Sequence, residues 1–214
     1  MLAYPLAAVL ALQTLAAVPQ AGPQYVERCD PCTIVLHDGT PPAEFRFELE
    51  TVPEGRVVKA IVFERGGHTV QKLNVASMTP LAQDESFFFG GQEINFDGWL
   101  DLLLMTERGS ANAKAEYWVY DPAADRFRDL GEFPMFSVDA VHKRLSTYVS
   151  NGPAGLDFEK HEYAFEGKNL IVMSEETQKP SPNRPGWYVR TVRRRNNGNL
   201  VVVRRQTVKQ PPTP

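Results

Sequence analysis

The sequence predicts an all-β protein. Short apolar or alternating runs recur at intervals of about ten residues, separated by Gly, Pro and Asn-Gly breakers, and no long amphipathic helical pattern is present. A chain of 214 residues with 43% hydrophobic composition buries one sizeable core, so we expect a single domain over residues 22–209. The pattern by itself leaves a sandwich, a barrel and a propeller open.

The first half of the chain reads as strands joined by tight turns. Phe45, Phe47 and Leu49 alternate with charged residues, which is the period of a half-buried strand. Gly- and Pro-containing breakers at 39–42 and 53–55 flank this run. The strands expected here are 33–37, 44–50, 56–63, 69–75 and 86–89.

The second half continues the same pattern. Residues 101–106 form an apolar run typical of a central strand, and Asn197-Gly198 is the strongest short signal for a hairpin turn. The Pro-rich segments 179–185 and 210–214 are predicted to be a linker and a tail. The strands expected here are 101–106, 115–120, 126–130, 144–150, 158–165, 169–174, 187–195 and 200–207.

The N-terminus predicts export. Residues 2–18 are an apolar run, rich in Ala and Leu, that ends in small residues as a secretory signal does before cleavage. No Lys or Arg precedes the run, and a short buried helix is the alternative, but the run is too short to span a bilayer comfortably. We therefore expect a signal peptide at 1–21, no membrane span, and a periplasmic or secreted protein.

The chain has two cysteines, Cys29 and Cys32. In an oxidising compartment this pair is predicted to form a small-loop disulfide. A redox centre would need a strand before it and a helix after it, and a zinc site would need two more nearby ligands, whereas the four histidines are scattered singly.

The net charge of -3 is unevenly distributed. Residues 177–214 contain nine Lys or Arg and no acid, which leaves 14 basic and 26 acidic residues in the rest of the chain. Basic ends of this kind bind nucleic acid or anionic surfaces in some proteins, but these charges lie on a predicted strand hairpin, where they protect an exposed edge from aggregation. We favour the protective role and expect no nucleic-acid partner.

The segment 93–101 places oxygen-bearing residues at alternate positions around a tight turn. Calcium takes about six to eight hard oxygen ligands, and a short loop supplies them from alternate positions, with a glycine at the sixth making the bend. Gly98 occupies the bend, and the predicted calcium ligands are Glu93, Asn95, Asp97, the carbonyl of Trp99, and Asp101.

This loop is not an EF-hand. Leu104 stands where an EF-hand has its bidentate Glu, and a strand rather than a helix follows. The simpler alternative is an Asn-x-Asp-Gly turn whose side chains cap their own backbone. We favour calcium because more positions agree with the calcium pattern than a capped turn requires.

Nothing in the sequence predicts an enzyme. It contains no Gly-rich phosphate loop, nucleophile elbow, metalloprotease helix or Cys/His nucleophile pair. Glu159 and Glu162 are a carboxylate pair of the kind a glycosidase uses, but both lie on a predicted exposed strand face.

Three segments between residues 56 and 176 carry a family resemblance. They are 93–102, then 117–122 followed by Phe127, and 145–163 with 168–172. In these segments the chain resembles exported immunity proteins that neutralise lysozyme-like effectors of a bacteria-killing type IV secretion system, a family similar in fold to periplasmic inhibitors of invertebrate-type lysozyme. The resemblance implies a propeller-like or barrel-like arrangement of antiparallel hairpins, one calcium ion at the Asn95-Phe96-Asp97-Gly98 loop, and inhibition by a loop that enters the hydrolase cleft.

We therefore expect an exported calcium-binding inhibitor whose partner is a lysozyme-like peptidoglycan hydrolase. The inhibitory loop is expected at 150–161; where the family carries a Tyr after its loop glycine, this chain offers an apolar Leu or Phe. The expected target-binding residues are Gly152, Leu156, Phe158 and Lys160. The alternative is a secreted calcium-dependent β module that binds glycan or a cell-surface protein, although a single calcium-loop motif argues against a repeat-built module.

Overall fold

The computed structural model describes residues 24–26, 31–83, 85–109, 112–152 and 155–209. The predicted signal peptide, Cys29 and the 210–214 tail lie outside these residues, so the disulfide between Cys29 and Cys32 stays a prediction. Cys32 itself is buried in the core. In the described part of the chain, no helix is long and apolar enough to cross a membrane.

The named elements are all β-strands, as the sequence predicts. They are β1 (Gln24–Val26), β2 (Cys32–Ile34), β3 (Ala43–Val52), β4 (Gly55–Arg65), β5 (His68–Asn74), β6 (Phe89–Gln92), β7 (Asp101–Glu107), β8 (Lys114–Asp121), β9 (Arg126–Pro134), β10 (Ser137–Asp139), β11 (Arg144–Ser150), β12 (Phe158–Glu166), β13 (Asn169–Pro180), β14 (Trp187–Asn196) and β15 (Asn199–Lys209).

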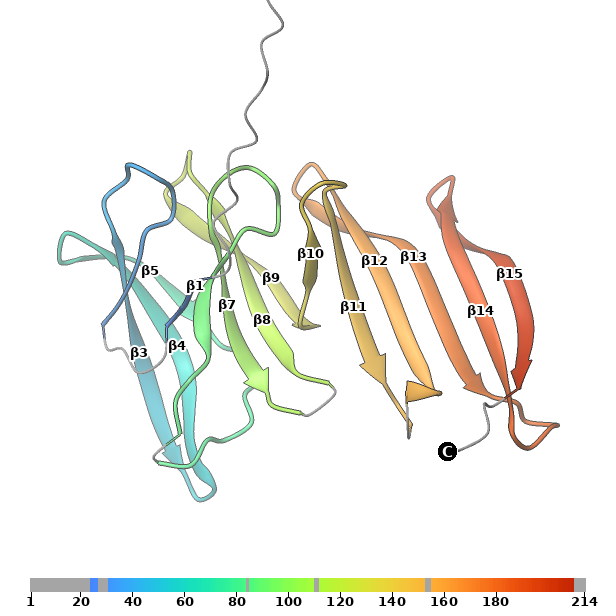
Figure 1. The fold of residues 1–214 in the computed structure, drawn as a ribbon. Coiled ribbons are helices and arrows are strands. Elements are labelled where there is room, and N and C mark those ends of the chain that lie inside the picture. Colours follow the sequence, from blue (N-terminus) through green and yellow to red (C-terminus); the bar gives the residue numbers. More distant parts are fainter. Residues whose placement is uncertain (1–23, 27–30, 84, 110–111, 153–154, 210–214) are drawn as a thin grey trace, which may run out of the picture.

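The strands form three antiparallel sheets that follow one another across the molecule (Figure 1). Sheet A has the order β1-β6-β7-β8-β9, sheet B has β2-β3-β4-β5, and sheet C has β10-β11-β12-β13-β14-β15. Sheet A lies in the middle. One hydrophobic cluster joins residues of sheets A and B, and a second cluster joins residues of sheets A and C.

Sheet A is covered on both faces, which explains the apolar run at its centre. Leu102 and Leu104 face the cluster shared with sheet B, while Leu103 faces the cluster shared with sheet C. The neighbouring strand, β8, is also buried on both faces: Trp118 belongs to the cluster shared with sheet B, and Tyr117 belongs to the cluster shared with sheet C. A strand buried on both sides reads as continuous hydrophobic sequence, and this confirms the prediction of a central strand at 101–106.

The barrel-like or propeller-like closure expected from the resemblance is not found among the described residues. Each sheet is open and keeps two edge strands. In sheet C, successive hairpins from β10 to β15 pair edge to edge in one extended sheet. The last strand, β15, therefore does not pair with the first strand, β10, as closure would require.

Sheet C extends well beyond the core. Its first strands supply Leu145 and Tyr163 to the second cluster, but no residue of β14 or β15 is buried. The hairpin of β14 and β15 therefore projects away from the packed layers (Figure 1). Residues 199 to 209 form its outer strand, which within the described part of the chain pairs only with β14.

Candidate functional site

The predicted calcium loop joins β6 to β7, whose ends meet in the pair Gln92 and Asp101. Its apolar residues anchor it on both sides of sheet A: Ile94 belongs to the cluster toward sheet C, and Leu100 to the cluster toward sheet B. The ring of Trp99 stacks on His37 with 4.6 Å between centroids. The loop backbone is thereby fixed by packing at both ends, independently of any ion.

Asp101 is fully buried at the base of the loop. Its Oδ2 accepts hydrogen bonds from the backbone N–H of Ile94 at 2.9 Å and of Asn95 at 3.3 Å, and its Oδ1 accepts one from Tyr120 N–H at 2.9 Å. Burial raises the pKa of Asp101 to about 8, and the charge of Asp97 acts in the same direction, while the three N–H donors act against it. Asp101 thus ties the loop to β8.

The remaining oxygen-bearing side chains curl around the turn. Asn95 Oδ1 accepts from Asp97 N–H at 3.1 Å, and Asp97 Oδ1 accepts from Trp99 N–H at 2.9 Å. Glu93 Oε1 accepts from Gly98 N–H at 2.7 Å. Gly98 has φ of 91°, a left-handed conformation that favours glycine. These bonds bring side chains from the first, third and fifth loop positions to one turn, and they are the backbone caps expected for the simpler alternative, an Asn-x-Asp-Gly turn.

A calcium ion at this loop stays a prediction, and it would be held partly by neutral oxygens. Among the described residues, no three or more of His, Cys, Asp and Glu are arranged to hold a metal by themselves. Calcium also accepts amide, carbonyl and water oxygens, which Asn95 and the Trp99 carbonyl would supply beside Asp97 and Glu93. Asp97 makes no ion pair with a Lys or Arg in the part of the chain that the structure describes. Both carboxylate oxygens of Asp101 already accept hydrogen bonds from backbone N–H groups. Direct ligation of calcium by Asp101 stays a prediction.

A cavity of about 460 Å³ opens beside this loop. Its lining includes Asn95 and Asp97 of the loop and Lys168 of the turn between β12 and β13. The Lys168 ammonium lies 2.7 Å from Asp121 Oδ2 and lowers the pKa of Asp121. The cavity is lined by Asn95, Asp97, Val119, Tyr120, Asp121, Pro122, Ala123, Arg128, Phe165, Gly167 and Lys168.

The four predicted target-binding residues lie together at one end of the β11–β12 hairpin, although residues 153 and 154 between them are outside the described chain. The base of this loop is closed by the hydrogen bond from Asn151 N–H to Asp157 O at 2.8 Å. Gly152 and Leu156 belong to the loop, and Phe158 opens β12. Lys160 is exposed and pairs with Tyr148 across the hairpin.

Phe158 belongs to neither hydrophobic cluster. Its ring instead stacks on Tyr148 of β11, with 5.5 Å between centroids and an interplanar angle of 28°. Tyr148 is 47% exposed, and its hydroxyl donates to Gly155 O at 3.4 Å. Phe158, Tyr148 and Lys160 share the outer face of sheet C, because cross-strand partners point to the same side.

Sequence reasoning missed Tyr148. The signal was present: residues 144–150 alternate, and Leu145 and Thr147 are buried while Tyr148 is exposed. An aromatic residue at an exposed position of an alternating strand is a candidate for a contact outside the hydrophobic core.

No protein-family model and no curated protein matches this chain. A solved structure does, that of a Xanthomonas type IV secretion system related protein, with a TM-score of 0.51 and 13% identity. The alignment covers 88% of this chain and 97% of that chain. At this identity the likeness establishes the fold: three antiparallel sheets in an arrangement shared with a protein related to type IV secretion.

Proposed function

We propose that this chain is an exported, calcium-binding inhibitor of a lysozyme-like peptidoglycan hydrolase. The observation that carries the proposal is the stacked pair of exposed Tyr148 and half-buried Phe158, beside a loop whose base is closed by the hydrogen bond between Asn151 and Asp157. Further support comes from the sequence resemblance around 93–102 and from a fold shared with a type IV secretion system related protein. Immunity proteins act on effectors, so their chemistry is binding and not turnover; we propose no enzymatic activity.

The loop is braced where it leaves the sheet. Asn112 Nδ2 donates to Ser150 O at 2.7 Å, and Ser150 N–H donates to Asn112 Oδ1 at 2.8 Å. Gly155 adopts φ of 67°, and its carbonyl oxygen accepts a hydrogen bond from the Tyr148 hydroxyl. A braced loop loses less conformational entropy on entering a cleft than a free one, so more of the contact energy appears as affinity.

The residues around the loop match the chemistry of a lysozyme-like cleft. Tyr148 and Phe158 supply rigid aromatic surface, which dominates many binding hot spots. Lys160 stands exposed on the same face and is placed to meet the carboxylates that such a cleft presents. Gly152 keeps the loop narrow: a Cβ there would come within 3.0 Å of the Asp157 Cβ.

Calcium enters this proposal as a structural ion. When bound, it supplies positive charge to the carboxylates of the loop. Glu93, Asn95, Asp97 and the Trp99 carbonyl are the proposed holders. Asp101 orients the loop from beneath, by accepting hydrogens from the loop and from β8. The ion would thus stiffen the connection between β6 and β7 and take no part in contacting the hydrolase.

The test is inhibition of cell-wall hydrolysis. We would capture exported peptidoglycan hydrolases of the same organism with the mature chain, then measure their turnover of peptidoglycan with and without it. Tyr148→Ala and Phe158→Ala should each weaken inhibition by roughly tenfold or more, the effect of losing a hot-spot aromatic. The matched control is Tyr188→Ala, which removes an aromatic side chain from the same face of sheet C but from β14, two strands away from β12.

Full inhibition by both loop variants would contradict the proposed contact, since these side chains would then not reach the cleft. Failure to capture or inhibit any hydrolase, with glycan binding present instead, would favour the calcium-dependent β module. Equal losses in the loop variants and in Tyr188→Ala would mean that the whole outer face of sheet C is the contact surface.

A further inference from the structure

The hairpin of β14 and β15 does not stabilise the core. None of its residues is buried, and three consecutive valines on β15 are well exposed, Val201 at 39%, Val202 at 56% and Val203 at 53%. Since burial of apolar surface is the main source of stability, this hairpin adds strand hydrogen bonds but little hydrophobic stabilisation. The exposed side chains of this hairpin are therefore available to contact another molecule.

The arginines of this hairpin fall into two groups. Arg190 pairs with Glu176, and Arg193 pairs with Glu175, so these two cations are compensated by carboxylates of β13. The second group makes no hydrogen bond or ion pair within the residues that the structure describes. Its members are Arg194, Arg195, Arg204 and Arg205.

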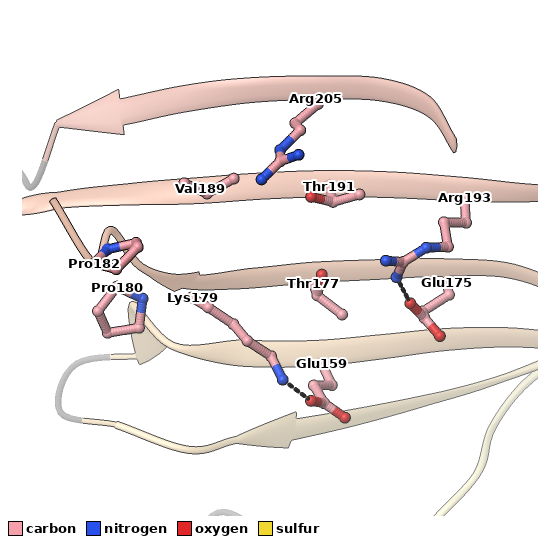
Figure 2. A pocket seen from close by; sticks show the side chains of 10 residues that line it. All are labelled: Glu159, Glu175, Thr177, Lys179, Pro180, Pro182, Val189, Thr191, Arg193 and Arg205. Carbon is pink, nitrogen blue, oxygen red and sulfur yellow. Dashed lines mark hydrogen bonds and ion pairs between the residues drawn. The ribbon is translucent and has the colours of Figure 1, made fainter. Parts of the chain in front are cut away.

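The free arginines are distributed over both faces of the sheet. Arg204 lies opposite Val192 and Arg205 opposite Thr191, and successive residues of a strand point to opposite sides. Figure 2 shows Arg205 reaching from β15 over the face that carries Thr191 and Val189. Arginine side chains thus lie on both faces of the sheet beside the outer edge of β15.

The face that carries Arg205 forms an open cleft of about 470 Å³. Figure 2 shows that its carboxylates are already engaged: Glu159 pairs with Lys179 at 2.9 Å, and Glu175 pairs with Arg193. These acids lie on β12 and β13, whereas Arg205 lies on β15. The uncompensated charge of the cleft is therefore positive and lies toward the free edge.

The edge itself offers backbone hydrogen bonds. β15 is 11 residues long and, among the described residues, pairs with β14 alone, so every second N–H and C=O along its outer side is left without a strand partner there. An incoming extended segment satisfies these groups by adding a strand, the binding mode known as β-augmentation. The exposed valines give such a segment apolar contacts as well.

We propose that the β15 edge is a docking site for an acidic, extended segment of a partner protein, which adds to sheet C as a seventh strand. The segment carries carboxylates on both of its faces, because Arg204 and Arg205 flank the edge on opposite sides. This site is separate from the loop at 150–161 and does not rest on the proposed inhibition of a hydrolase.

A second copy of the chain does not fit this edge. β15 carries Arg204, Arg205 and Lys209 and no acid, so edge-to-edge pairing of two copies would place like charges along one ladder. Nucleic acid fits less well than a strand, since β15 has no aromatic side chain on which bases would stack and its valines would stay in water. A flat anionic membrane would meet the arginines of only one face at a time.

The test uses the full mature chain and an 11-residue peptide of Glu-Glu-Val repeats, as long as β15. Its matched peptide replaces every Glu by Gln. We expect measurable binding of the acidic peptide only, weakened by added salt, together with slower hydrogen exchange of β15 backbone amides. The double variant Arg204→Glu/Arg205→Glu should bind roughly tenfold more weakly, as two exposed charge pairs are lost.

The control makes the same two charge reversals at exposed lysines of sheet B, Lys59→Glu/Lys72→Glu, and should keep full affinity. Unchanged melting temperatures would show that both variants fold. Several results would overturn the inference: equal binding of the Gln peptide, equal loss in the control variant, unaltered exchange at β15, or tighter binding of a single-stranded oligonucleotide or of anionic vesicles. Self-association of the chain that the double variant abolishes would likewise overturn it, in favour of pairing between copies.

Discussion

Glu116 gives the sharpest prediction about stability, because it is a buried carboxyl that forms no ion pair with any described residue. It is 2% exposed, and its Oε2 accepts a hydrogen bond from Ala76 N–H at 3.1 Å. Burial is the first cause that raises its pKa from 4.5 to about 7, and the charges of Asp129 and Glu132 add to the shift. The folded state therefore binds a proton at Glu116 more tightly than the unfolded state does.

The sign of the pH dependence follows from linkage. A carboxyl with a raised folded-state pKa stabilises the fold fully below its unfolded pKa, and this stabilisation is lost as pH rises through the folded pKa. The window is from about pH 4.5 to about pH 7. The full shift corresponds to about 3 kcal/mol, which we reduce to roughly 2 kcal/mol because the neighbouring carboxylates are exposed and water screens the site.

Glu116→Gln removes the titration and keeps an acceptor for Ala76 N–H. Against the wild type, its free energy of unfolding in urea should be nearly equal at about pH 4.5 and higher by roughly 2 kcal/mol at about pH 8. Asp101 also has a raised pKa, but it is present in both proteins and cancels in the difference. The control is Glu54→Gln, an exposed turn residue. A difference between Glu116→Gln and wild type that stays constant with pH would refute this reasoning.

Three further predictions concern the loops. Calcium at a hundredfold excess over its dissociation constant should stabilise the fold by about 2.7 kcal/mol, chelation should reverse this, and Asp97→Ala should abolish it; identical melting curves would contradict a calcium site. Cys29 and Cys32 should form a disulfide by mass spectrometry of the exported protein, and the double Ser variant should keep its inhibition; two free thiols would contradict this. Phe158→Ala should cost only about 1 kcal/mol, since the ring stacks on Tyr148 and lies outside both clusters; a loss of about 3 to 5 kcal/mol would mean that it is a core residue.

Most strands were predictable because their sequences carry the signal locally. Residues 144–150 were predicted as a strand and β11 has these bounds, and the turn at Asn197-Gly198 joins β14 to β15 as expected. β1 and β10 were not predicted, since three residues are too few to show a period. β13 runs six residues beyond its predicted end at 174, because β12 and β14 supply hydrogen bonds to a polar sequence that has no apolar pattern of its own.

The arrangement of the sheets was beyond the sequence, because it depends on which faces meet. The run at 101–106 indicates a strand buried on both sides, but it does not say that one side meets sheet B and the other sheet C. Closure into a barrel and extension of an open sheet also use the same hairpins and turns. Sheet C continues outward through the pairing of β13 with β14, and that pairing involves polar residues on both strands.

The same limit explains what the sequence could say about Asp101. The spacing of Asp101 from Glu93 predicts that Asp101 is a ligand within the loop. Sequence spacing shows which residues share a turn, but it does not show contacts with other strands. The structure adds a neighbour from another strand: Tyr120 N–H, 19 residues away, donates to the same carboxylate that holds Ile94 and Asn95. A residue that fastens the loop to β8 resists replacement even without an ion, whereas Asp97, exposed at the turn, is bonded only to neighbouring loop residues. Asp101 thus fixes the shape of the loop through its hydrogen bonds, and Asp97 stays the predicted carboxylate ligand of calcium.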